Sequence, residues 1–115
     1  MAKIKRLKVK YCFDELGFPV VVSNLTFDEF DMLDLLLSGD LHTQSSLLKF
    51  EQVTMRERKV WWSDATKVYF ESGELEITSA CGFEATVRIS HSVLQQVLDD
   101  WNKFLINKIA FEAEY

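Results

Sequence analysis

The stretch VYFESGELEI, residues 68–77, alternates apolar and polar side chains on both sides of a Ser72-Gly73 pair. Alternation with a period of two is typical of a half-buried β-strand, and a two-residue loop that ends in glycine is typical of a β-hairpin. The loop length fixes the pairing and places Phe70 opposite Leu75. We therefore expect a hairpin with one apolar face and one charged face.

A further strand is predicted to extend this hairpin into a meander. If Ala80-Cys81-Gly82 forms a three-residue loop, Ile77 lies opposite Ala85 and the strand over residues 83–89 turns its apolar side chains to the same face. Two independent turns that agree on one buried face favour an antiparallel meander.

The residues before the hairpin are predicted to add another strand. A loop over residues 63–67 places Val60 and Trp62 on the apolar face. Trp61 then lies on the opposite face, beside Tyr69. This placement depends on the assumed loop length.

Strands are also expected near both ends of the sequence. Residues 6–13 alternate, and residues 18–22 form a β-branched run. Residues 109–115 alternate again, which is typical of a short last strand or an ordered tail. The stretch 47–58 is ambiguous, and we interpret it as a strand.

Two capping boxes predict helices. Thr26 with Glu29 precedes a helix over residues 27–38 that stops at Gly39 and leads into a polar loop over residues 40–46. Ser92 with Gln95 precedes a helix over residues 93–105, whose apolar arc has Trp101 at its middle. We expect Trp101 to be a core anchor, because a large apolar side chain in that position is usually buried.

These elements indicate an α+β fold. We expect one domain over residues 1–115, with an antiparallel sheet of five to seven strands and a meander in its C-terminal half. Two helices are predicted to pack on one face of the sheet.

The charge is distributed unevenly along the chain. The net charge is −5, but the first ten residues hold five basic side chains and no acid, which leaves 8 basic against 18 acidic residues after them. The acidic residues after position 10 repel phosphate and attract cations. This charge disfavours nucleic acid and favours a basic protein as the partner.

No apolar run approaches the length of about 20 residues that crosses a bilayer. The charged start of the chain also lacks the apolar stretch of a signal peptide. We therefore expect no membrane association and a cytoplasmic location.

The sequence contains no local motif for catalysis, a cofactor or a metal. Cys12 and Cys81 lie far apart and are interpreted as reduced thiols, and His42 and His91 lack companions at metal-ligand spacing. There is no G-x-S-x-G motif and no phosphate-binding glycine loop. These features favour a protein that is not an enzyme.

The charged face of the meander is the first candidate binding surface. Carboxylates gathered around aromatic side chains suit a basic partner, because the aromatics supply binding free energy and the acids steer encounter. The candidate residues are Trp61, Tyr69, Glu71, Glu74, Glu76 and Glu84.

The alternative is that the strand over residues 6–13 covers this face. Arg6, Lys8 and Lys10 would then lie beside the glutamates as a ladder of surface ion pairs, which stabilise a fold little.

The outer arc of the first helix is a second candidate surface. Its residues are Phe27, Asp28, Asp31, Asp34 and Leu35. The alternative reading is structural, since acids in a first helical turn favour the helix dipole and a charged stripe is usually just solvated.

The preferred hypothesis is a small acidic protein that neutralises a basic partner. Bacterial immunity proteins and antitoxins, which block toxins such as nucleases, are the class that this size and charge favour. A structural module that acts as a homodimer is one alternative. A small-molecule enzyme is another, although it would need a polar cluster inside the core.

Overall fold

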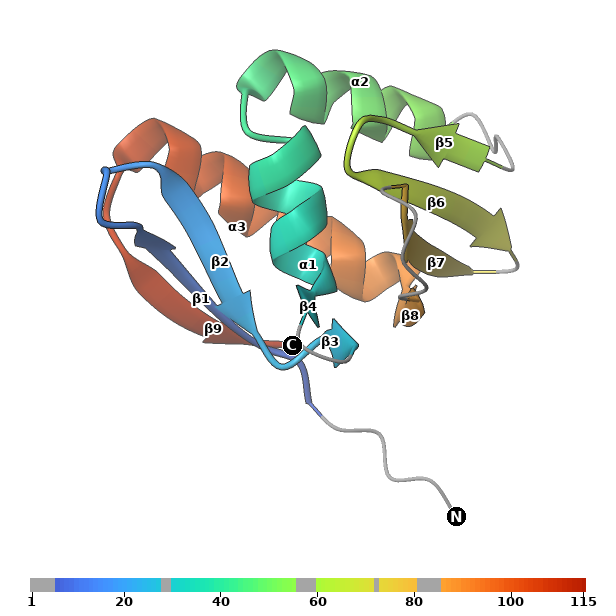
Figure 1. Cartoon of the computed structure of the whole chain (residues 1–115), viewed down its shortest axis with the longest axis horizontal. Coiled ribbons are helices and arrows are strands. Elements are labelled where there is room, and N and C mark those ends of the chain that lie inside the picture. Colours follow the sequence, from blue (N-terminus) through green and yellow to red (C-terminus); the bar gives the residue numbers. More distant parts are fainter. Residues whose placement is uncertain (1–5, 28–29, 56–59, 72, 81–85) are drawn as a thin grey trace.

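A computed structural model of the chain describes residues 6–27, 30–55, 60–71, 73–80 and 86–115. Within them the chain forms two antiparallel sheets of three and four strands, a two-stranded hairpin and three helical segments (Figure 1). The predicted α+β class is confirmed. The prediction of one sheet with two helices is wrong, because the strands near the chain ends pair with each other rather than with the meander. Glu29 and residues 83–85 lie outside the described residues.

The first sheet joins segments from the two ends of the described chain. Its central strand β1 (Lys8–Phe13) pairs antiparallel with β2 (Pro19–Ser23) on one side and with β9 (Phe111–Glu114) on the other. The predicted strands in these three regions are confirmed. Their alternation turns Val9 and Tyr11 into the core and Lys8 and Lys10 outward.

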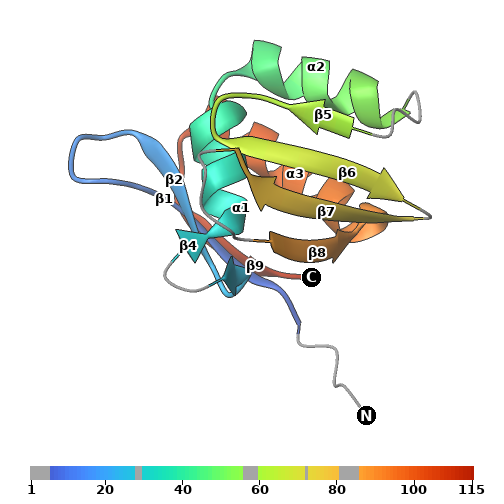
Figure 2. The same ribbon diagram turned by 45° about the vertical axis from the view of Figure 1, so that its right-hand side comes forward.

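The second sheet contains the predicted meander. It has the order β5 (Val60–Trp62), β6 (Thr66–Glu71), β7 (Glu74–Ser79) and β8 (Thr86–Ser90). Figure 2 shows α3 behind β6 and β7 and α2 above β5, so that one face of the sheet packs inward and the other is turned outward.

The predicted register of the central hairpin is confirmed, with Phe70 opposite Leu75. The next register is wrong by two residues, because Ile77 lies opposite Val87 instead of Ala85. The connection is therefore longer than the three residues assumed. A shift of two residues keeps every side chain on its predicted face, since strand side chains alternate with a period of two.

The placement of β5 is wrong by a single residue, and its two faces are exchanged. Trp61 lies opposite Val68 and Trp62 opposite Lys67, so Trp61 points inward and Trp62 outward. The cause lies in the turn before β6. Thr66 is fully buried, and its backbone N–H and its hydroxyl both donate to the Asp40 carboxylate.

The first helical segment begins later than predicted. Strands β3 (Thr26–Phe27) and β4 (Phe30–Asp31) pair antiparallel, and the helix starts as α1 (Met32–Asp34). Asp31, not Thr26, is the N-cap, because its carboxylate accepts from the N–H groups of Leu33 and Asp34.

The segment also continues past its predicted end. A π-helix, η1 (Leu35–Asp40), follows α1 and contains Gly39, which we had expected to be the C-cap. A Cβ at Gly39 would approach the Ala65 side chain to 3.3 Å, so the glycine lets η1 pack closely against the turn before β6.

The stretch that we interpreted as a strand over residues 47–58 is a helix, α2 (Gln44–Met55). Thr43 and Ser46 cap its start reciprocally, since each side-chain oxygen accepts from the other residue's backbone N–H. Leu47 and Phe50 are buried one helical turn apart, whereas Leu48 is exposed. This capping pair also shortens the predicted polar loop at residues 40–46.

The predicted C-terminal helix is confirmed as α3 (His91–Asn107), with a different cap. Ser90, not Ser92, accepts from the Val93 N–H at 3.2 Å. At the other end Lys108 adopts the left-handed conformation and its N–H bonds the Phe104 carbonyl, which turns the chain back towards β1.

The core lies where α1, η1 and α3 meet the inner faces of the two sheets (Figure 1). Trp101 of α3 is fully buried, as predicted, and its indole N–H donates to the Leu41 carbonyl oxygen at 2.7 Å. No helix among the described residues combines the length and apolarity needed to cross a bilayer.

Replacing Trp101 with Phe should lower the free energy of unfolding by about 2 to 4 kcal/mol. The smaller ring leaves a cavity and removes the partner of the buried Leu41 carbonyl. Urea denaturation followed by circular dichroism measures the change. An unchanged denaturation midpoint would contradict the anchoring role.

Candidate protein-binding surface

The outward face of the second sheet brings together most of the residues of the first candidate surface. Along β6 and β7 the inward positions hold Val68, Leu75 and Ile77, all buried. The residues between them point the other way, and these include Tyr69, Glu71, Glu74 and Glu76. Glu84 lies outside the described residues.

Trp61 does not belong to this face. Its ring packs edge-on against Phe50 of α2, with the centroids 4.8 Å apart. Trp62 takes the outward position instead and is 69 % exposed. No local signal in the sequence distinguishes the two tryptophans, because the register of β5 depends on a contact with the distant Asp40.

An aromatic pair with a cation between its members occupies one part of the outer face. The Lys67 ammonium lies 5.1 Å from the centroid of the Trp62 ring and 5.4 Å from that of Tyr69. Both distances lie in the cation–π range, so the two rings share the positive charge of Lys67.

The carboxylates occupy the adjoining part of the face. Glu76 pairs with Arg88 across β7 and β8 at 3.3 Å. Glu71 lies directly opposite Glu74 at the β6–β7 turn, and neither forms an ion pair with a described residue. A hollow beside them is lined by Tyr69, Glu71, Glu74, Leu75, Glu76 and Arg88. This end of the face is therefore negative and lacks internal compensation among the described residues.

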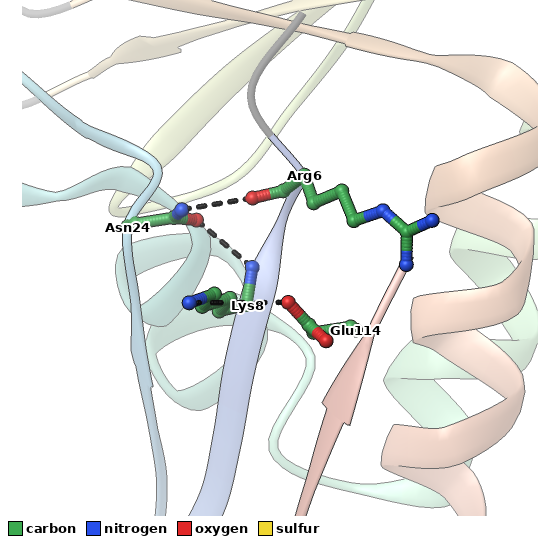
Figure 3. Close-up of polar contacts among 4 residues, drawn as sticks. All are labelled: Arg6, Lys8, Asn24 and Glu114. Atoms are coloured by element: carbon green, nitrogen blue, oxygen red, sulfur yellow. Dashed lines mark hydrogen bonds and ion pairs between the residues drawn. The ribbon is translucent and has the colours of Figure 1, made fainter.

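The alternative that the strand over residues 6–13 covers these glutamates is wrong. That strand is β1, which belongs to the first sheet. Figure 3 shows its local partners: Asn24 accepts from the Lys8 backbone N–H and donates to the Arg6 carbonyl, and the Lys8 ammonium lies 3.9 Å from Glu114.

The acids of the second candidate surface are used within the fold. The Asp34 carboxylate accepts from the Val21 N–H at 2.9 Å, and Asp31 accepts from the N–H and the hydroxyl of Ser23. Both residues therefore bond the outer edge of β2. Leu35 is half-buried against the core, while Asp28 and the Phe27 side chain lie outside the described residues. The described members of this set, Asp31, Asp34 and Leu35, therefore serve the fold rather than an exposed surface.

A partly buried hydrogen-bonded group of Tyr11, Tyr115 and Asp100 joins α3 to β1 and to the residue that follows β9. The Tyr11 and Tyr115 hydroxyls are 2.6 Å apart, and Tyr115 donates to Asp100. Burial raises the pKa of both phenols, so they stay protonated and act as hydrogen-bonding groups.

The described residues contain no cluster of side chains that could bind a metal ion. No three of their His, Cys, Asp or Glu side chains lie close enough to hold a metal ion. His42 and His91 are both exposed, and they belong to different segments. The outer face of the second sheet is therefore the strongest candidate site among the described residues.

No protein-family model, curated protein or solved structure matches the chain.

Burial raises the pKa of the Asp31 carboxyl above its ordinary value, although the hydrogen bonds from Ser23 oppose the shift. Folded Asp31 thus takes up its proton at a higher pH than the unfolded chain does. As the pH falls through this window, protonation of Asp31 favours the folded state.

Replacing Asp31 with Asn removes this contribution. The free energy of unfolding of the wild type minus that of Asp31→Asn should therefore increase as the pH falls from neutrality towards the ordinary pKa of aspartate. Urea denaturation at a series of pH values measures this difference. If this difference decreased on acidification, the pKa of Asp31 would be lowered by folding, not raised.

Proposed function

We propose that the protein binds and neutralises a basic partner protein through the outer face of its second sheet. A bacterial immunity protein or antitoxin that blocks a basic toxin, such as a nuclease, is the class we favour. The observation that carries the proposal is the Glu71–Glu74 pair, which is uncompensated among the described residues. Tyr69 lines the hollow beside this pair, and the exposed Trp62 lies further along the same outward face.

The two glutamates favour a cationic ligand because like charges directly opposite each other across a hairpin repel. A partner's Lys or Arg placed between them would relieve that repulsion. Glu76 contributes less, because Arg88 already neutralises it.

The aromatic side chains supply what the carboxylates lack. Exposed carboxylates mainly accelerate encounter and set specificity, whereas desolvated Trp and Tyr provide most of the binding free energy of an interface. Trp62 and Tyr69 come from adjacent strands of one sheet. Tyr69 lies opposite Glu76 and lines the hollow beside the glutamates, whereas Trp62 lies further along the same face. Their positions are fixed by the strand ladder, so little conformational entropy is lost on binding.

The overall charge supports the same class of partner. The net charge is −5, and Lys67 and Arg88, the cations on this face among the described residues, contact the aromatic pair and Glu76 respectively. The field at this face therefore attracts basic proteins and repels nucleic acid.

The double variant Glu71→Lys/Glu74→Lys should weaken binding by at least about a hundredfold, roughly 2.7 kcal/mol, because two attractive charges become repulsive. The partner is captured on the immobilised wild-type chain from its own cells, and its dissociation constant is measured by calorimetry. The wild-type affinity should also fall as salt is raised.

The matched control is Glu15→Lys/Asp99→Lys. It makes the same change in net charge at exposed positions in the β1–β2 turn and on α3, away from the outer face. Equal loss of affinity in both double variants would assign the effect to net charge and remove the site.

The adjacent tryptophans form a second, matched comparison. Trp62→Ala should weaken partner binding by about tenfold or more while changing the free energy of unfolding by less than about 1 kcal/mol. Trp61→Ala should lower the free energy of unfolding by about 3 kcal/mol, because its ring packs on the buried Phe50. Thermal denaturation and calorimetry separate the two effects. The reverse pattern would mean that β5 has the register predicted from the sequence.

A further inference from the structure

Strand β9 forms one edge of the first sheet, and its backbone groups are available there. Leu7 and Tyr115 exchange both of their backbone hydrogen bonds, which marks them as a hydrogen-bonded antiparallel pair. In such a ladder every second residue bonds the neighbouring strand. Ala113, opposite Val9, therefore bonds β1, whereas the N–H and C=O groups of Glu112 and Glu114 point away from it.

The opposite edge of the same sheet is closed. The N–H groups of Val21 and Ser23 on β2, which correspond to those of Glu112 and Glu114 on β9, donate to the carboxylates of Asp34 and Asp31. No described residue accepts from the outward N–H groups of β9, and β9 pairs with β1 alone. An open edge is a template for another strand.

The side chains of β9 define what such a strand would carry. Glu112 and Glu114 are exposed on the outer face, and the neighbouring strand already places Lys10 and Lys8 opposite them. On the inner face Phe111, Ala113 and Tyr115 are only half-buried. A strand with basic residues at alternate positions and apolar residues between them would match both faces.

A second copy of the chain is a poor occupant. Antiparallel pairing of two β9 strands centred on Ala113 would place Glu112 of each copy opposite Glu114 of the other, and directly opposed like charges are destabilising.

We propose that β9 accepts an extended basic segment of a partner protein as a fourth strand of the first sheet. The outward backbone groups of Glu112 and Glu114 supply the main-chain hydrogen bonds, and their carboxylates select Lys or Arg at alternate positions. This surface lies on a different sheet from the Glu71–Glu74 pair, and its docking does not depend on the function proposed above.

The probe is a synthetic peptide of alternating lysine and valine, compared with a peptide of the same composition whose lysines are grouped at one end. Binding is measured by titration, and amide hydrogen exchange is followed by NMR. The alternating peptide should bind about tenfold more tightly than the grouped one. It should slow exchange at Glu112 and Glu114, whose amides exchange rapidly in the free protein.

Equal affinity for the two peptides would overturn the proposal. So would slow exchange of the Glu112 and Glu114 amides before any peptide is added, or protection that appears on the second sheet instead.

A matched pair of variants separates the backbone from the charge. Glu112→Pro removes one outward N–H and leaves the bonds between β1 and β9 in place, which is where an edge strand tolerates proline. Glu112→Ala removes only the carboxylate. Affinity for the alternating peptide should fall at least about tenfold for the proline variant and by a few-fold for the alanine variant.

An equal loss in the two variants would exclude main-chain pairing. Circular dichroism confirms that both variants are folded, and the exchange experiment on the wild-type chain stands even if the proline variant is not. The tenfold preference for the alternating over the grouped peptide should persist in Glu71→Lys/Glu74→Lys, although the affinity for both peptides falls with the lost negative charge. A protein that fails the partner-binding test can therefore still pass this one.

Discussion

The buried carboxylate of Asp40 decides which side chains the second sheet presents to solvent. It lies at the end of η1 and accepts from the N–H groups of Ala65 and Thr66 and from the Thr66 hydroxyl. A buried carboxylate is stable only when its oxygens are bonded, so the turn before β6 has to keep this position. The register of β5 follows from that turn, and with it the outward Trp62 and the inward Trp61.

Hydrogen bonding also separates the acids of the chain by role. Asp31, Asp34 and Asp40 all accept backbone N–H groups and complete elements of the fold. Glu71 and Glu74, on the outward face of the second sheet, accept no backbone N–H from the part of the chain that the structure describes. Position in the fold, rather than residue type, distinguishes an acid that caps an edge from one that is available to a partner.

Features set by short-range chemistry could be predicted from the sequence. The expected two-residue loop predicts the β6–β7 register, in which Glu71 lies opposite Glu74, and Gly73 adopts the positive φ typical of such loops. The long apolar arc of α3 is likewise local. The start of α2 could also have been predicted, because Thr43 and Ser46 form a capping pair. The polar residues of α2 concealed its helical period.

The remaining features depend on contacts between distant segments. The pairing of β1 with β9, the capping of β2 by Asp34 and the bond from Asp40 to Thr66 join residues that no local pattern relates. The candidate site shows the same division. Tyr69 and the glutamates of the hairpin follow from its turn, whereas the choice between Trp61 and Trp62 required the long-range contact.

The pairing of β1 with β9 has a consequence for the order of folding. Neighbouring strands of the second sheet lie close together in sequence, so they close short loops, whereas β1 has to meet a strand near the other end of the chain. Closing a longer loop costs more entropy and slows the search. The meander can thus be assembled early, and the sheet that unites the two ends of the chain is completed last.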